Sequence, residues 1–154
     1  MTIVELSTRV NPVVSAVLRS RAHWLLSRGL MLITVTGRKS GRVYTIPVGY
    51  HETEDAIIVL VSEAHKKKWW RNYRSPGKMG LLLRGKPLEG TAHVLPPESP
   101  EFRCRADASL RRARFMPRLF GIDFDREKGL TDAQVQKLGE DVAIVEIVVA
   151  KATP

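Results

Sequence analysis

Short apolar runs separated by turn residues occupy most of the middle of the chain. Six such runs, rich in β-branched and aliphatic residues, cover 30–36, 43–50, 56–61, 79–83, 88–94 and 142–149. Runs of about four to eight residues bounded by Gly, Pro, Asn, Asp or Ser are typical of β-strands. Residues 37–41, between the first two runs, have the composition of a hairpin loop. The pattern therefore predicts six short strands that pair mostly in antiparallel fashion.

Helical spacing of apolar residues is restricted to segments outside these runs. An Asn-Pro pair is typical of a helix start, and the apolar positions that follow it predict a helix over 12–28. A second helix is predicted over 99–117 and a third, short one over 131–139, while 66–73 has room for one or two helical turns. The early connections are too short for the crossovers of a parallel sheet. A small β-barrel with flanking helices is therefore the favoured architecture.

Length and composition indicate one globular domain. The chain has 154 residues, of which 44% are hydrophobic and 27% charged, so a single domain over 1–154 is expected. No apolar run approaches the roughly 18 residues of a membrane span, and the first residues lack the features of a secretory signal. Cys104, the single cysteine, cannot form an internal disulfide and is expected to be a buried or half-buried side chain. These features favour a cytoplasmic protein.

Positive charge is concentrated in three parts of the chain. Lys and Arg number 25 against 16 Asp and Glu, which gives a net charge of +9 and predicts an acidic partner. The first cluster lies in the turn at 38–42, the second has eight basic and no acidic residues within 64–86, and the third lies at 103–118. The third is interpreted as a solvated helix face, whereas the first two lie beside glycines and aromatic residues. An anionic ligand is therefore expected at the first two.

The usual catalytic motifs are absent from the sequence. It contains no Gly-x-Ser-x-Gly, no Cys-x-x-Cys, no His-Glu-x-x-His and no phosphate loop that ends in Gly-Lys-Ser or Gly-Lys-Thr. The four histidines lack the spacing of metal ligands, so no metal site is predicted. Hydrolysis by a metal or by a catalytic triad is therefore disfavoured, and the first two basic clusters remain as the candidate site.

The turn at 37–42 has the composition of an anion-binding loop. Glycines at positions 37 and 41 bracket it, and glycine allows a positive φ and a close approach of the backbone to a ligand. Arg38, Lys39 and the Ser40 hydroxyl can all donate to phosphate or carboxylate oxygens. A ligand with several negative charges would suit this turn.

Tryptophans stand next to lysines in the second cluster, which contains the segment Lys66-Lys67-Lys68-Trp69-Trp70-Arg71-Asn72. A flat apolar surface beside cations suits an aromatic ring joined to an anionic tail. Packing of this tryptophan pair in the core is an equal alternative, because one of two adjacent helical residues is expected to point inward.

Several of these residues together resemble a known family. Thr36 to Arg42, Pro47, Tyr50, Val59 to Ser62 and Trp69-x-x-Asn72 are similar to motifs of the deazaflavin-dependent nitroreductase family, within the split β-barrel flavin and deazaflavin oxidoreductases. The resemblance extends over about 11–95. It implies a six-stranded antiparallel split β-barrel, like the FMN-binding split barrels, that binds reduced coenzyme F420 and passes its hydride to an organic acceptor. FMN is a weaker alternative ligand, since split barrels that bind it generally lack this basic turn.

The resemblance also implies which residues contact the coenzyme. The basic turn would hold its phosphate and oligoglutamate tail, and the end of the third predicted strand would lie against the deazaflavin ring. The implied coenzyme-binding residues are Gly37, Arg38, Lys39, Ser40, Gly41, Arg42, Pro47, Leu60, Val61, Ser62, Lys66, Lys67, Lys68, Trp69 and Asn72. Ser62 and Lys67 are the candidate catalytic residues, because either can donate to the negative charge that develops on the acceptor.

The chain departs from the family pattern in three places. Lys66 to Lys68 replace a stretch that carries glycines and a proline in many members, and Tyr44 stands where many members have a second arginine. A tyrosine-rich C-terminal segment, which lines the acceptor pocket of nitroimidazole-reducing members, is absent. Reduction of drug-like nitro compounds is therefore not expected.

The sequence thus predicts an F420H2-dependent reductase that transfers a hydride to a small-molecule acceptor such as a quinone or a conjugated carbonyl or ene compound. The N-terminal helix and the late helices would form part of the acceptor pocket. A non-catalytic split barrel that binds a cofactor or a lipid is one alternative. A basic nucleic-acid-binding module is a less favoured one, and no nucleic-acid partner is expected. A homodimer and a peripheral membrane contact through the helix at 12–28 stay open.

Overall fold

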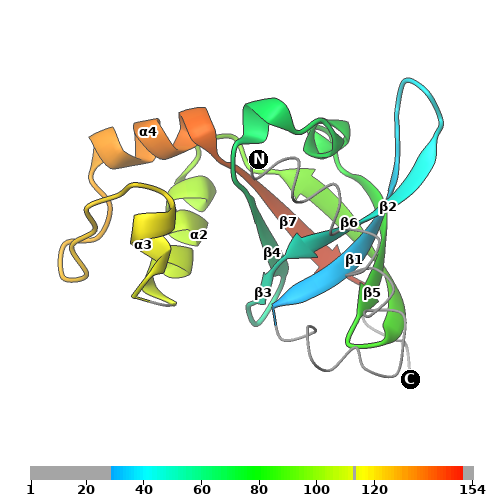
Figure 1. The fold of residues 1–154 in the computed structure, drawn as a ribbon, viewed down its shortest axis with the longest axis horizontal. Coiled ribbons are helices and arrows are strands. Elements are labelled where there is room, and N and C mark those ends of the chain that lie inside the picture. Colours follow the sequence, from blue (N-terminus) through cyan, green and yellow to red (C-terminus); the bar gives the residue numbers. More distant parts are fainter. Residues whose placement is uncertain (1–28, 113, 151–154) are drawn as a thin grey trace, which may run out of the picture.

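The computed structural model of the chain describes residues 29–112 and 114–150. Its strands form one curled antiparallel sheet in the order β2-β1-β5-β6-β7-β4-β3 (Figure 1). The strands are β1 (Leu30–Thr36), β2 (Val43–Gly49), β3 (His51–Glu52), β4 (Ile57–Val61), β5 (Gly77–Leu83), β6 (Lys86–Val94) and β7 (Ala143–Val149). Two short 3-10 helices, η2 (Ala64–Lys66) and η3 (Trp69–Tyr73), connect β4 to β5. The mainly β, antiparallel architecture predicted from the sequence is confirmed.

The sheet has seven strands where the sequence predicts six. The additional strand, β3, is two residues long and pairs with β4, His51 opposite Ile58. Strand β2 ends at Gly49, which pairs with Leu30, the first residue of β1. The chain beyond Gly49 therefore has no β1 residue opposite it and pairs with β4 instead. The count differs because residues 51 and 52, which lie beyond the predicted run 43–50, form this short strand.

Strands β4 and β7 separate two hydrophobic cores. Val59 and Val145 are buried in the interior of the curled sheet, while Ile58 and Ile144 are buried on the opposite face beneath the helices. Successive side chains of a strand point to opposite faces, so this alternation follows directly from the extended backbone. Both faces of these strands are covered, which explains why their sequences are continuous apolar runs rather than alternating ones.

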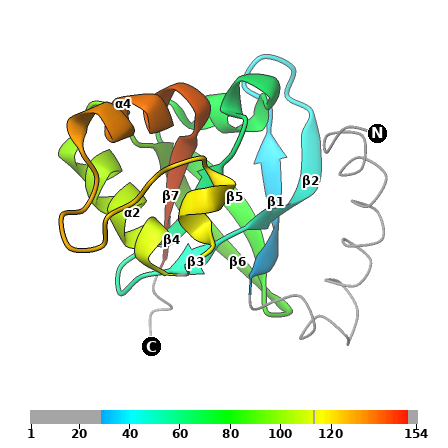
Figure 2. The ribbon, with the colours of Figure 1, turned by 60° about the vertical axis from the view of Figure 1, so that its left-hand side comes forward.

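Three helices form a layer on one side of the sheet, α2 (Pro100–Arg111), α3 (Met116–Leu119) and α4 (Asp132–Asp141) (Figures 1 and 2). The Ser99 hydroxyl accepts the Phe102 N–H at 3.1 Å and begins α2 as the sequence predicts. The predicted helix over 99–117 is instead divided into α2 and α3. Proline is tolerated only in the first turn of a helix, so a new helix begins where Pro117 occurs.

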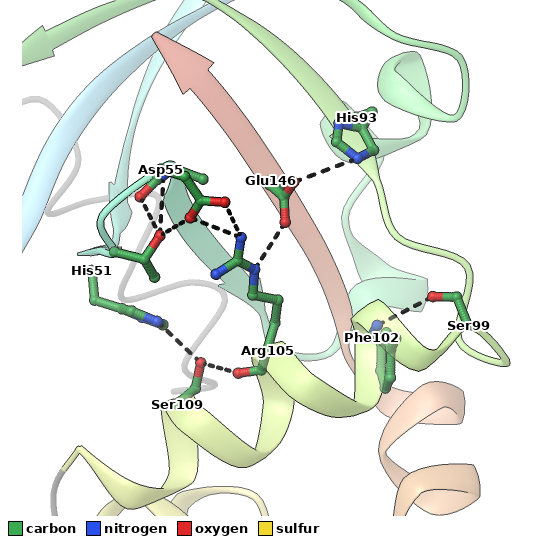
Figure 3. A network of polar contacts seen from close by, with 10 residues as sticks. His51, Asp55, His93, Ser99, Phe102, Arg105, Ser109 and Glu146 are labelled. Atoms are coloured by element: carbon green, nitrogen blue, oxygen red, sulfur yellow. Dashed lines mark hydrogen bonds and ion pairs between the residues drawn. The ribbon is translucent and has the colours of Figure 1, made fainter.

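A polar network joins α2 to the strands (Figure 3). Arg105 donates to Glu146 of β7 at 2.9 Å and to Asp55 of the β3–β4 turn at 3.2 Å. The Ser109 hydroxyl donates to the Arg105 carbonyl at 2.7 Å, so His51 donates its Nε2–H to the Ser109 oxygen, 3.3 Å away. Burial, together with the charges of Arg112 and Arg105, lowers the pKa of His51 to about 4. This imidazole is therefore neutral near pH 7.

Cys104 lies exposed on α2, so the expectation of a buried or half-buried cysteine is wrong. The buried positions of α2 include Phe102, Ala106 and Leu110, and the cysteine falls on the opposite side of the helix. Within the part of the chain that is described, no helix has the length and apolar character needed to cross a membrane. The predicted helix over 12–28 lies outside the described residues.

Candidate functional site

The basic turn between β1 and β2 is held by its own backbone. The Gly37 N–H donates to the Arg42 carbonyl at 2.9 Å, and the Gly41 N–H donates to the Gly37 carbonyl at 2.8 Å. Gly41 has φ +67°, a conformation that favours glycine, and a Cβ on Gly37 would lie 2.8 Å from the Ser40 hydroxyl oxygen, which would have to shift. Arg38 and the other two cations of the turn are exposed. The turn is thus an ordered loop that presents its cations to solvent.

The structure brings this turn onto the Trp69–Asn72 segment. The Arg38 N–H donates to the Asn72 side-chain oxygen at 3.0 Å, and the Arg38 guanidinium donates to the Ser75 carbonyl. The Asn72 amide nitrogen in turn donates to the Trp69 carbonyl at 2.9 Å. Two motifs that lie about 30 residues apart in the sequence therefore form one site, with Asn72 as the clamp between them.

The two adjacent tryptophans point in different directions. Trp69 is 7% exposed and packs in the sheet interior, where Tyr73 of the same helix is also buried. Trp70 is half-buried and donates its indole N–H to the Ala64 carbonyl at 2.8 Å. This arrangement matches the expectation that one member of the pair points inward. A contact between Trp69 and the coenzyme stays a prediction, and only a small part of the Trp69 side chain is exposed enough to make it.

The end of β4 places Ser62 beside Lys67. Their hydroxyl oxygen and ammonium nitrogen lie 3.5 Å apart, and burial lowers the pKa of Lys67 although Glu63 opposes the shift. Val61, just before Ser62, is buried in the sheet interior, whereas Leu60 packs under the helices. The structure therefore brings together the two candidate catalytic residues and directs the two preceding side chains to opposite faces.

A cavity of about 290 Å³ opens beside Ser62. Its other walls include Leu119 at the end of α3, the adjoining Phe120, and Lys137 and Leu138 of α4. The late helices therefore contribute to a cavity that is also lined by Ser62, and binding of the acceptor there stays a prediction.

The lysines before Trp69 differ in their electrostatic surroundings. Lys66 pairs with Glu63 at 3.2 Å, whereas Lys68 is exposed. Within 29–112 and 114–150, no carboxylate pairs with Lys68 or with any cation of the basic turn. Pro47, the remaining predicted contact, is half-buried on β2 opposite Leu32 of β1. The positive charge of the turn and of Lys68 is thus available to an anion.

Tyr44 is a member of the site that sequence reasoning missed. Its hydroxyl hydrogen-bonds Asn72, and burial nevertheless raises the pKa of the phenol. The neighbouring Tyr73 phenol, whose pKa burial also raises, donates to the Lys78 carbonyl at 3.3 Å. Tyr44 shares its face of β2 with Ile46 and Val48, which pack on the sheet interior. That alternation was the available signal for an inward-pointing tyrosine.

A curled antiparallel sheet with helices on one side and a basic turn at its rim defines the chain as a split-barrel protein. The model of the F420H(2)-dependent quinone reductase family matches residues 14–123, and the chain belongs to this family. No curated protein matches the chain.

Solved structures show the same fold at low sequence identity. The F420-H2 dependent reductase FDR-A is 22% identical with a TM-score of 0.52, and the match covers 80% of this chain and 96% of that chain. The heme storage protein HutZ from Vibrio cholerae is 14% identical with a TM-score of 0.54, covering 83% and 85%. A chain described as a domain-swapped dimer is 20% identical with a TM-score of 0.53, covering 89% and 94%.

Family membership makes coenzyme F420 the cofactor of this chain. The donor set of the basic turn fits the anionic part of such a molecule. Arg38, Lys39 and Arg42 present guanidinium and ammonium donors, and none of them has a carboxylate partner among the described residues. The Ser40 oxygen accepts the Arg42 N–H at 3.2 Å, which leaves the hydroxyl hydrogen free to donate.

Proposed function

We propose that the chain is an F420H2-dependent oxidoreductase that transfers a hydride to a small organic acceptor such as a quinone or a conjugated carbonyl or ene compound. The contact between the Arg38 N–H and Asn72, at 3.0 Å, carries this proposal. It joins the anion-binding turn to the segment that leads back to Lys67 and Ser62. In this proposal, a ligand with a charged tail and a ring contacts both parts of the site.

The basic turn binds the tail in this proposal. Arg38, Lys39 and Arg42 provide charge-assisted hydrogen bonds to phosphate and carboxylate oxygens, each of which contributes about 1.5–3 kcal/mol. Because the turn is closed by its own backbone bonds, little ordering of the loop is needed on binding. Lys68 adds a further exposed cation.

The end of β4 orients the reacting partners. Bound F420H2 supplies two electrons as a hydride from its ring carbon, so the chain need not provide an acid–base pair for bond cleavage. The Ser62 hydroxyl and the Lys67 ammonium donate to the negative charge that the acceptor oxygen gains. Burial lowers the pKa of Lys67, which makes its Nζ a stronger proton donor to that oxygen. The cavity beside Ser62 holds the acceptor and excludes water.

Turnover of the reduced coenzyme tests this function. Anaerobic mixing of the chain with F420H2 and menadione should oxidise the coenzyme faster than the same mixture without protein, as followed by its absorbance. Binding of F420 without oxidation would favour the non-catalytic split barrel. Failure to bind F420, together with oligonucleotide binding that weakens steeply with salt, would favour the nucleic-acid module.

Assembly and location are further parts of the proposal. We infer a homodimer, for which the domain-swapped dimer among the similar structures offers a precedent in the fold. Light scattering of the full chain measures this directly, and the mass of a single chain would contradict it. A peripheral membrane contact through 12–28 is tested by co-sedimentation with lipid vesicles, and a cytoplasmic location by fractionation of cells.

A further inference from the structure

A second cavity, of about 390 Å³, lies on the other side of η3 from the basic turn. Its walls come from η2 and η3, from the connection between β6 and α2, and from the end of α4 with the start of β7. Figure 2 shows the 3-10 helices beside β1, with the C-terminal end of α4 across from them. The volume lies within the range of about 300–1,000 Å³ that is typical of small-molecule sites.

Helix η3 presents a different face to each of three neighbours. Trp69 and Tyr73 enter the sheet interior, Asn72 clamps the basic turn, and Trp70 and Arg71 line the cavity. No residue of the turn at 37–42 lines the cavity, and His65 and Val142 are the only described residues that it shares with the cavity beside Ser62. The same short helix thus lies between this cavity and the basic turn.

The lining combines a fixed aromatic face with apolar walls. The Trp70 indole N–H is already bonded to the Ala64 carbonyl, so the ring is oriented and has no polar hydrogen left to satisfy. Val94, Leu95 and Pro96 contribute apolar surface to the same cavity. A planar aromatic molecule fits such walls, because ring faces pack well against indole and proline surfaces.

Two guanidinium groups lie beside the Trp70 ring in this cavity. Those of Arg71 and Arg74 are 5.6 and 5.4 Å from the centre of the Trp70 ring, within the range of cation–π contact. Neither pairs with a carboxylate in the described part of the chain, and Arg71 makes only a long 3.5 Å bond to the His65 carbonyl. Glu140 is the single acidic residue among the described lining residues. The cavity therefore favours an anion.

We propose that this cavity binds a small planar aromatic anion, such as an aromatic carboxylate, at a site separate from the basic turn and from the cavity beside Ser62. The ring lies against Trp70 and the apolar wall, and the anionic group receives hydrogen bonds from Arg71 and Arg74. Binding at this site is independent of the proposed reductase activity.

Nuclear magnetic resonance titration of the full chain with 2-naphthoate tests the proposal. The indole N–H signal of Trp70, assigned with Trp70→Phe, should shift and saturate, while that of Trp69 should move much less. The double variant Arg71→Gln/Arg74→Gln should weaken binding at least tenfold, and Arg114→Gln/Arg118→Gln, which removes two exposed cations elsewhere, should not. The neutral analogue 2-naphthylmethanol should bind at least tenfold more weakly than the acid.

Three results would overturn the site. They are a Trp70 signal that does not saturate, equal binding of the acid and the alcohol, and displacement of 2-naphthoate by F420 or menadione. The last result would show that the cavity belongs to the reductase site. A chain that binds 2-naphthoate as expected but does not oxidise F420H2 would contradict the proposed function and leave this inference standing.

Discussion

Arginine has opposite surroundings on two sides of the molecule. Arg105, whose side chain is 19% exposed, lies between Glu146 and Asp55 and connects α2 to the sheet. Arg38 and Arg42 of the basic turn are exposed and, among the described residues, have no carboxylate partner. A guanidinium that is already bonded to carboxylates holds elements together, whereas one in the open can bind the anion of a ligand. Cations paired with carboxylates therefore distinguish the structural side of this chain from its binding side, where the cations of the turn have no carboxylate partner among the described residues.

The largest effect is expected on the binding side. Arg38→Ala together with Lys39→Ala removes two charge-assisted contacts and should weaken F420 binding by about 3 kcal/mol or more, at least a hundredfold. Fluorescence titration with F420 measures the affinity. The control Lys86→Ala/Lys128→Ala removes the same charge from exposed positions outside the turn and should change it much less. Equal losses of F420 affinity in the two variants would mean that the turn contributes only through the overall positive charge of the protein.

Acid should destabilise the structural side through His51. Its pKa is about 4 in the folded chain against an ordinary value of 6.5, so the unfolded chain binds the proton first as the pH falls. Above pH 6.5, the ordinary pKa of histidine, His51 does not change the free energy of unfolding. It should drop by up to about 3 kcal/mol between pH 6.5 and 4, at about 1.4 kcal/mol per pH unit.

Urea unfolding of the wild type and His51→Gln across this range measures the drop. Carboxylates that titrate in the same range affect both proteins, so the difference between their curves isolates the imidazole. The variant should lose less stability on acidification. A wild-type slope in His51→Gln would contradict the burial argument.

Removing the bonded arginine should affect stability rather than binding. Arg105→Ala leaves Glu146, whose side chain is 16% exposed, without its main partner and should lower the free energy of unfolding by about 2 kcal/mol. Arg103→Ala is the matched control, because its carboxylate partner Asp132 is 94% exposed and such a pair contributes about 1 kcal/mol or less. Arg103 also donates to the Leu130 carbonyl, and the loss of this one bond should cost about 1 kcal/mol. Thermal unfolding compares the two, and F420 affinity should be unchanged in both. A loss of affinity in Arg105→Ala would break the division between the two sides.

Local patterns made most of the fold predictable, and long-range partners account for what was missed. The strand runs and the Ser99 cap depend on neighbours in sequence, which explains why they were found. The pairing of β3 with β4 depends on how the sheet curls, and the contact of Arg105 with Glu146 joins residues 41 positions apart. At the site, the basic turn and the Lys-Trp segment were both identified, but their junction through Asn72 was not, because no periodicity reports a contact across 34 residues.

The smallest effect is expected where the turn and η3 meet. Asn72→Ala removes the acceptor of the Arg38 N–H and should weaken F420 binding by about 1 kcal/mol, roughly fivefold, because the turn loses its orientation. Hydrogen exchange at the Arg38 amide should accelerate in the same variant, which identifies Asn72 as a positioning residue. Gln134→Ala is the matched control, since it removes a comparable capping bond from α4, 3.0 Å long, without touching the site. A hundredfold loss in Asn72→Ala with unchanged exchange at Arg38 would show instead that the Asn72 side chain contacts the coenzyme directly.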